Sequence, residues 1–446
     1  MPIAILLVEA AKSQRRPKQN YLVSQEPTIL YISNMMISND HLKSPVRLLI
    51  VCSLAMLTAI GTLLFLPESA PGQSGNSQSG DLQSSSVESD VSLADQKQQY
   101  EDSIEELRGA LKGMERAAAM YFHNESSLAQ EHQTQWQLEA DRAKVAYEDV
   151  RKNGIELFLA SDKPDDGLTL VAASFSQTAI DRGQLTQCYS LSRKLTELHP
   201  DDTGLKSLLG RSAILTDNLE VAKSFASENK SLIDQFPLPE RLLYSVLEET
   251  TTKFDRELEI RAKEEKADDL PRVELKTTKG KIVLELFENE APETVANFIS
   301  LVNEGFYNGN LFHRVVNKFG AHSGFATSLG PRLPPYTIYD EFKKPDARHH
   351  FRGTITMVGQ YGRENAGSSQ FMISLVPNLH LDGGSTVFGR VISGMNVADN
   401  LQRTFSVDET SGKEEYIEGT SPDIIQTAKV IRDRGHAYEP NRVEKE

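Results

Sequence analysis

The residue types that could do chemistry gather in the last third of the chain, in three short blocks. The first block is Phe312-His313-Arg314-Val315, with Phe319 just after it; the second is Ser369-Gln370-Phe371-Met372, and the third is Leu381-Asp382-Gly383. Arginine is permanently charged and only donates hydrogen bonds. The apolar side chains in the same blocks could form a slot beside it.

Rotation about an X–Pro peptide bond is a reaction that needs only such groups. Its barrier is about 18–20 kcal/mol, because amide resonance resists twisting. A catalyst needs an apolar slot for the proline ring and a donor that stabilises the twisted amide more than the planar one. A permanently charged guanidinium suits this role, because it can donate to the prolyl nitrogen as the resonance is lost.

The order and separation of these blocks, with Val387-Phe388-Gly389-Arg390-Val391 after them, resemble the cyclophilins. That family consists of peptidyl-prolyl cis-trans isomerases built on an eight-stranded β-barrel. The resemblance covers about residues 272–438. It implies an enzyme that acts on proline-containing polypeptides and needs no cofactor and no metal.

The resemblance also assigns the site residue by residue. The arginine that follows Phe-His in the family is catalytic, and here it is Arg314. The remaining positions of the family's substrate site fall on Phe319, Met357, Val358, Gly359, Gln370, Met372, His380, Leu381 and Ser385. Phe371 is expected in the core instead.

Several positions depart from the family pattern. A glutamine that holds the substrate carbonyl in cyclophilins is replaced by His322, which can donate one hydrogen bond and is the second candidate catalytic residue. The family's glycine-rich loop becomes residues 328–335, and its Ala-Asn pair becomes Val358-Gly359. Three interpretations stay open: an isomerase of reduced activity, a domain that binds proline peptides without turning them over, and a structural tether in which the helical region is the functional part.

The neighbouring histidines do not predict a metal site. His349-His350 follow Arg348, and no carboxylate or cysteine completes a ligand set at the usual spacing. We interpret them as loop residues.

The elements that must position these residues are visible in the pattern. Residues 273–277 and 281–286 alternate apolar and polar residues around a glycine, which predicts a β-hairpin. Pro292 is expected to open a helix that buries Val295, Phe298, Ile299 and Val302. Residues 423–431 are expected to form the closing strand.

Before this region the pattern is helical. Residues 100–121 and 136–150 each carry an apolar stripe, which predicts a helical hairpin with its break near residues 123–127. Residues 168–235 resemble a degenerate tetratricopeptide array, with a non-repeat helical bundle as the alternative. If the array is real, the resemblance implies a protein partner at this region. Residues 236–269 are expected to be a charged helix or a linker.

The run from Leu48 to Leu66 contains no charged residue and is long enough to cross a bilayer, which takes roughly 20 residues. Lys43 and Arg47 precede it, so the rest of the chain is expected outside the cytoplasm. A cleaved signal peptide is the alternative, but residues 67–71 offer no clean small-x-small site. A start codon at Met35 or Met36 is a further hypothesis.

The composition agrees with a multi-domain chain. It has 446 residues, a net charge of −15 and only two cysteines, Cys52 and Cys188, for which we expect no disulfide. The acidic balance argues against a nucleic-acid partner. The predicted order is a cytoplasmic tail (1–47), a transmembrane anchor (48–66), a disordered linker (67–93), an all-α region (94–269) and a cyclophilin-like closed β-barrel with flanking helices (270–438). We therefore predict a single-pass membrane protein whose C-terminal domains are extracytoplasmic, or periplasmic if an outer membrane is present.

Overall fold

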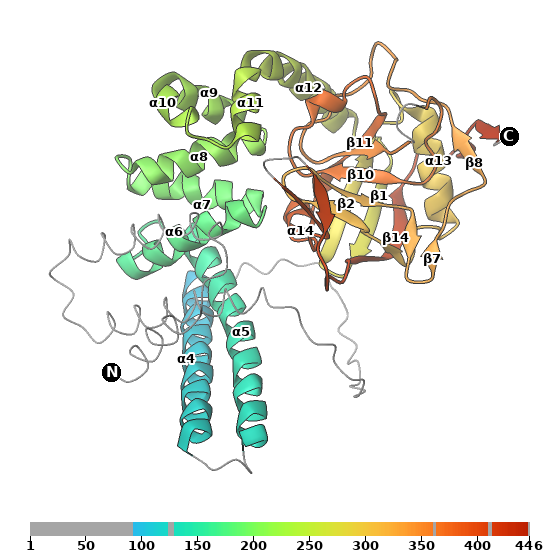
Figure 1. Ribbon diagram of the computed structural model, residues 1–446. Coiled ribbons are helices and arrows are strands. Elements are labelled where there is room, and N and C mark those ends of the chain that lie inside the picture. Colours follow the sequence, from blue (N-terminus) through green and yellow to red (C-terminus); the bar gives the residue numbers. More distant parts are fainter. Residues whose placement is uncertain (1–91, 124–128, 360–362, 409–412, 445–446) are drawn as a thin grey trace. The chain divides into compact units, whose positions relative to one another are not determined.

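The computed structural model describes residues 92–123, 129–359, 363–408 and 413–444 (Figure 1). They belong to one compact unit, Gln78–Glu446. The predicted tail, the membrane run at 48–66 and nearly all of the predicted linker lie outside the described residues. Within the described ranges, no helix combines the length and the apolar character that crossing a membrane requires.

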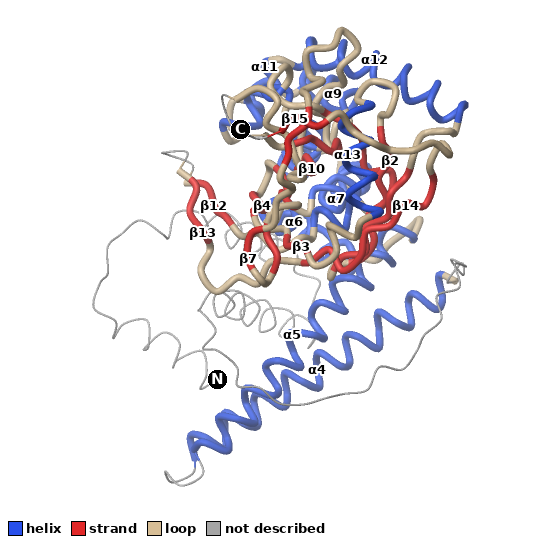
Figure 2. The backbone as a smooth tube through the Cα atoms, turned by 90° about the vertical axis from the view of Figure 1, so that its right-hand side faces the viewer, coloured by secondary structure: helices blue, strands red, loops and turns tan. Residues whose placement is uncertain are grey.

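The described chain begins with a hairpin of two long helices. Helix α4 (Leu93–His123) packs along α5 (Ala129–Ala160), as Figure 2 shows. Buried Ala110, Met114 and Ala143 form the seam, with Trp136 partly buried beside them. The predicted helical hairpin is confirmed, because apolar residues at steps of three and four can be buried only by a second helix.

Shorter paired helices follow: α6 (Asp166–Asp181), α7 (Leu185–Leu198), α8 (Thr203–Leu215) and α9 (Leu219–Glu228). The side chains of Asp165 and Asp202 cap α6 and α8 by accepting from backbone amides at 2.8 and 2.9 Å. A Cβ on Gly210 would meet the Phe225 ring at 2.5 Å, so only glycine permits this close helix pairing. The helical character of the region is confirmed, and its identity as a repeat array stays a prediction.

Three further helices lead to the β domain: α10 (Lys230–Ile233), α11 (Leu238–Ser245) and α12 (Leu247–Ala267). Helix α12 ends at Asp268, which adopts a left-handed conformation with φ 42°. The charged segment at residues 236–269 is therefore mainly helical.

The β domain opens as the sequence predicts. Strands β1 (Arg272–Thr277) and β2 (Gly280–Leu286) form an antiparallel hairpin, in which Gly280 has φ 133°. Helix α13 (Pro292–Asn303) begins with its proline and buries the predicted apolar face. The long strand β14 (Ile424–Arg432) pairs with β1.

The strands pair in the order β13-β12-β4-β5-β10-β9-β11-β2-β1-β14-β3-β6-β7. Those not yet given are β3 (Asn310–Leu311), β4 (Arg314–Val316), β5 (Gly320–Ser323), β6 (Ala326–Thr327), β7 (Gly330–Pro331), β9 (Thr354–Met357), β10 (Phe371–Ser374), β11 (Val387–Ser393), β12 (Phe405–Val407) and β13 (Glu414–Tyr416). A separate pair joins β8 (Tyr336–Ile338) to β15 (Arg442–Glu444). Two short helices complete the domain, η1 (Leu379–Leu381) and α14 (Met395–Asp399).

The ladder returns on itself through one bend. Strands β5 and β6 are separated only by Gly324, with φ 86°, and Phe325. Because β5 pairs with β10 and β6 pairs with β3, this bent segment closes the strands between β5 and β6 in that order into a ring. A Cβ on Gly324 would collide with the backbone of Ser369, which explains the glycine at the bend.

The interior of this ring is aromatic and aliphatic. Phe298 of α13 lies against Tyr307, Phe371 and Phe388, with ring centroids 4.9 to 5.6 Å apart. All four side chains are fully buried. Phe371 thus lies in the core, as expected from the sequence.

Charged pairs join the helices to the β domain. The buried Arg348 guanidinium donates to Glu257 of α12 at 2.7 and 2.8 Å and to Glu264 at 2.5 Å. It also lies 3.8 Å from the centroid of the Phe287 ring. Burial acts to raise the pKa of Glu257, but the hydrogen bonds and charge of Arg348 lower it overall. The contact therefore keeps its charges paired inside a dry interface.

Candidate active site

Strand register places three predicted site residues in one row. Arg314 on β4 lies opposite His322 on β5, and His322 lies opposite Met372 on β10. Directly opposed residues share one face of a sheet. The next row, Val315, Ala321 and Ile373, is fully buried and faces the core. The row of Arg314 therefore forms the outer face, where a substrate could lie.

The Arg314 guanidinium is held on three sides. Its Nη1 donates to His322 Nε2 at 2.5 Å, and its Nε donates to Glu414 at 3.0 Å. Its Nη2 forms a second hydrogen bond with the same carboxylate of Glu414. The guanidinium carbon lies 5.2 Å from the centroid of the Phe319 ring. A cation is thus fixed beside an apolar ring, with two of its five N–H groups left uncommitted by these bonds.

The contact with Arg314 sets the tautomer of His322, and burial is the main reason why its ring is neutral. A guanidinium has no acceptor, so His322 Nε2 must accept and the ring proton lies on Nδ1. Burial, followed by the charge of Arg314 and the proximity of His313, lowers the pKa of His322 to about 3. The imidazole is therefore neutral at physiological pH. Its single donor is Nδ1–H.

The floor beside this pair is apolar. Phe319 lies 6.2 Å from His322 and 6.3 Å from His380, measured between ring centroids. Met372 is buried, and a Cβ on Gly320 would meet its sulfur at 2.5 Å. The Met372 side chain thus occupies the space that the missing side chain of Gly320 leaves free.

The rim around Leu381 is tied to this floor. Leu381 is half-buried at the end of η1, and its amide donates to the Asn378 carbonyl at 2.9 Å. The Asn378 side chain donates to the Phe319 carbonyl at 3.0 Å. The exposed His380 has a pKa below its ordinary value, first because of partial burial and then because of His350.

The two loop histidines have a structural partner. His349 and His350 each place Nδ1 2.8 Å from the Asp382 carboxylate, which also accepts from the His350 amide at 3.0 Å. No group of three or more His, Cys, Asp or Glu residues within the described ranges is arranged to hold a metal. Both histidines thus brace the loop beside Leu381.

Four more of the predicted site residues lie next to strands β9, β10 and β11. The Val358 amide donates to the Gln370 carbonyl at 2.8 Å, and Gly359 is exposed just after it. Gln370 and Ser385 are half-buried at the starts of β10 and β11. Their substrate-binding roles stay predictions.

Met357 does not lie with the other predicted site residues. It lies opposite the core residue Phe371, is 4% exposed and belongs to the interior apolar cluster. A Cβ on Gly367 would meet its Cγ at 2.8 Å. The structure therefore places the Met357 side chain inside the ring of strands instead of in the predicted proline slot.

Sequence reasoning missed Glu414 and Gly320. Glu414 lies in an acidic stretch a hundred residues after Arg314, and the sequence gives no sign that the two meet. Strand β12 pairs with β4, and β13 pairs with β12 (Figure 2). This pairing brings Glu414 to Arg314. Gly320 stands next to Phe319, and its importance follows only from the position of Met372.

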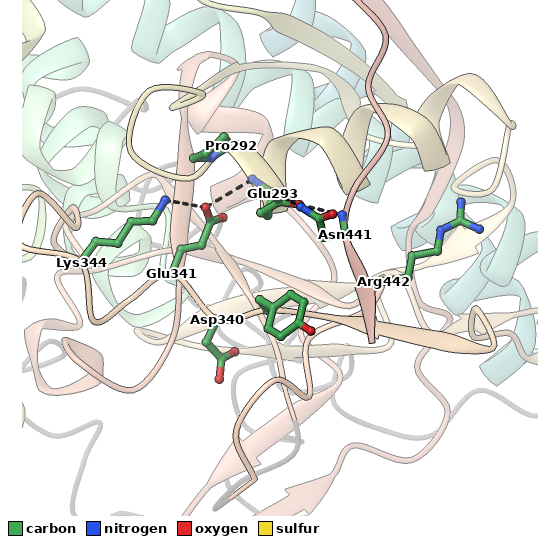
Figure 3. A pocket seen from close by; sticks show the side chains of 8 residues that line it. Pro292, Glu293, Asp340, Glu341, Lys344, Asn441 and Arg442 are labelled. Carbon is green, nitrogen blue, oxygen red and sulfur yellow. Dashed lines mark hydrogen bonds and ion pairs between the residues drawn. The ribbon is translucent and has the colours of Figure 1, made fainter. Parts of the chain in front are cut away.

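A separate cavity of about 490 Å³ lies at the start of α13 (Figure 3). Its Glu341 carboxylate accepts from the amides of Glu293 and Thr294 at 3.3 and 2.9 Å and from Lys344 at 2.8 Å. Glu293 in turn accepts from Asn441 beside β15. These charged groups are used to cap α13 and to hold the C-terminal strand.

The Arg314 face has donors but few groups for bond-breaking chemistry. The guanidinium of Arg314 only donates hydrogen bonds, and the histidine beside it stays neutral with one N–H. The surroundings are apolar and half-buried. Such a face can bind an amide and polarise it by hydrogen bonding.

Comparison with known proteins gives a family match for the β domain. Residues 272–429 match the family described as cyclophilin type peptidyl-prolyl cis-trans isomerase/CLD. A peptidyl-prolyl cis-trans isomerase of Helicobacter pylori is 40% identical over 143 residues, which cover 32% of this chain and 86% of that protein. The isomerase ppi1 of Schizosaccharomyces pombe is 40% identical over 145 residues, which cover 31% and 91%.

Among solved structures, a cyclophilin from Hirschia baltica is similar at 24% identity, with a TM-score of 0.30. The match covers 36% of this chain and 73% of that one. Helices α4 to α12 precede the residues that the family match covers.

The protonation state of His322 can be measured by NMR. We predict that its imidazole resonances do not shift between about pH 8 and about pH 5, because its pKa is far below the ordinary value. The exposed His436 is the control: bonds to the Ala437 carbonyl and to Glu288 raise its pKa, so it should titrate above about 6.5. As the pH falls, His322 is protonated near about 6.5 in the unfolded chain but stays neutral in the folded chain. The free energy of unfolding therefore decreases below about pH 6.5. A His322 midpoint near that of a free histidine would contradict the geometry.

Proposed function

We propose that the face around Arg314 catalyses rotation about X–Pro bonds in this chain, which belongs to the cyclophilin-type peptidyl-prolyl cis-trans isomerases. The single observation that carries the proposal is the guanidinium held 5.2 Å from the Phe319 ring, with an apolar floor beside it. The proline ring of a peptide would lie on Phe319, Met372 and Leu381. Arg314 would then donate to the prolyl nitrogen.

The proposed mechanism is electrostatic. Twisting the amide localises the nitrogen lone pair, which becomes a hydrogen-bond acceptor. A donor already in place stabilises the twisted state more than the planar one, which is the requirement for catalysis. The Nδ1–H of His322 is the donor left for the substrate carbonyl, since Nε2 accepts from Arg314.

A second candidate function rests on Glu414. The carboxylate pairs with Arg314 through two hydrogen bonds and competes with any prolyl nitrogen. If this pair persists when a peptide binds, the domain holds proline peptides without isomerising them. The helical region would then be the scaffold that carries a binding module.

We further propose that residues 48–66 anchor the chain and that the described domains work outside the cytoplasm on exported proteins. The support is the uncharged apolar run with basic residues before it. The helical region is proposed as the surface for a protein partner, because residues 168–235 resemble a repeat array that binds peptides.

Substitution of the two proposed catalytic residues tests the enzyme. In a proline-isomerisation assay of the full chain, Arg314→Ala should lower kcat/KM by roughly a hundredfold or more, the usual cost of losing a preorganised donor. His322→Ala should lower it roughly tenfold, and His322→Gln should keep or raise it, because an amide can both accept from Arg314 and donate. Turnover that survives Arg314→Ala unchanged would show that another residue is responsible.

Glu414→Gln tests whether this carboxylate competes with the substrate for Arg314. An exposed ion pair is worth up to about 1 kcal/mol, so releasing Arg314 should raise kcat/KM by roughly two- to fivefold. The matched control is Glu415→Gln, which removes the same charge from the same strand but pairs with Lys413 at 3.0 Å. A loss of turnover in Glu414→Gln alone would mean that the carboxylate orients Arg314 for the reaction.

Topology can be checked on the native protein. Protease added outside intact cells, or outside spheroplasts if an outer membrane is present, should digest the region after Leu66, and carbonate should leave the protein in the membrane. The reason is the apolar length and the charge asymmetry around it. Protection of the described domains from the protease would refute this orientation.

A further inference from the structure

The turn that carries Phe319 has an unusual backbone. Asn317, Lys318 and Phe319 connect β4 to β5, and Lys318 has φ 52°. A non-glycine residue in this region is strained and keeps its conformation only where its surroundings hold it. The contacts around this turn therefore decide where the Phe319 ring lies.

The first such contact comes from α11. Lys318 Nζ donates to Glu240 Oε1 at 3.0 Å. The Glu240 side chain is 0% exposed and also accepts from Arg211 of α8 at 3.2 Å. Separating a fully buried carboxylate from its cations is costly, because the unpaired carboxylate would remain in a dry environment.

The second contact comes from the end of α6. The Asn317 side chain donates to the Asp181 carbonyl at 2.9 Å. Gly183 has φ 73°, and a Cβ there would overlap Asn317 Oδ1 and the guanidinium of Arg403. Only glycine fits this position, so the helical chain approaches the turn as closely as its backbone allows.

The third contact holds the backbone of Phe319 itself. Its carbonyl accepts from the Leu375 amide and from the Asn378 side chain, each at 3.0 Å. Val376, between these two, is 4% exposed and packs in the apolar cluster of the helical region. Phe319 is thus flanked by two segments of the β domain, and each is anchored in the helices.

We propose that the helical region is a working part of the isomerase site, in which Glu240 positions Phe319 through Lys318. The helices α6 to α11 would then set the proline slot and so determine substrate affinity and turnover. This inference rests on the proposed function. It gives the region before the isomerase domain a role in catalysis by the same chain.

A merely structural interface would behave differently. Breaking it would lower stability, but the folded fraction would keep its normal kcat and KM. A positioning role predicts altered kinetics in fully folded protein, because a displacement of about 1 Å at a site can cost much of the rate. It also predicts that Lys318 and Glu240 act as one unit.

The experiment is a double-mutant cycle in the full chain. Lys318→Met, Glu240→Gln and the double variant are assayed with a peptide that contains one X–Pro bond, well below each variant's melting temperature. We expect each single variant to lower kcat/KM by roughly three- to tenfold, mainly through a higher KM. We expect the double variant to match the singles.

Arg211→Met is the matched control. It removes the other cation from the same buried carboxylate but makes no hydrogen bond or ion pair with the turn in the described structure. It should lower the melting temperature while leaving kcat/KM within about twofold. Asn317→Ala supplies a second test if Glu240→Gln does not fold, and it should raise KM in the same direction as Lys318→Met.

The outcomes separate the two proposals. Absence of turnover in the wild-type chain would overturn the proposed isomerase activity. The same double-mutant cycle would then be run on the Kd for the X–Pro peptide. In either measurement, effects of Lys318→Met and Glu240→Gln that simply add would overturn the positioning role. Single variants that behave like Arg211→Met would also overturn it.

Discussion

The hydrogen bond between Arg314 and His322 is the interaction on which the rest of the site depends. It joins two directly opposed residues of neighbouring strands, so the barrel sets its geometry. Because the histidine must accept, its ring is neutral and presents one N–H outward. Burial beside a permanent cation keeps it neutral. A cation and a neutral donor are thus fixed together at the edge of an apolar floor, and neither needs to reorganise when an amide arrives.

Charged groups make several of the contacts between the helices and the β domain. Arg348 is buried between Glu257 and Glu264, and Arg352 donates to Asp399 at 2.7 Å beside the start of α7. Buried pairs add little net stability compared with apolar packing, but a wrong alignment leaves charges unpaired. We interpret this chemistry as a means of fixing one register between the two regions. A fixed register is what a helical region needs if it is to hold a turn of the isomerase site in place.

Local periodicity was enough to predict the helical hairpin, the β1–β2 hairpin and α13, because each buries one regular apolar face. The joint placement of Arg314, His322 and Phe319 could also be predicted, since the first two lie on adjoining strands and Phe319 lies in the short turn between them. Met357 could not be placed in this way. Its strand is buried on both faces, so alternation does not show which side chains point inward. Glu414 and Glu240 reach the site only through the tertiary fold, at sequence distances for which no local pattern exists.

A crystal structure of the full chain with a bound X–Pro peptide would test the role of Arg314 most directly. The expected complex has the proline ring on Phe319, Met372 and Leu381, and the Arg314 guanidinium within hydrogen-bond distance of the prolyl nitrogen. At least one of the two hydrogen bonds between Arg314 and Glu414 should be broken in this complex. A peptide bound elsewhere on the domain, or bound here with the Arg314–Glu414 pair intact and no contact to the prolyl nitrogen, would contradict the proposed catalysis.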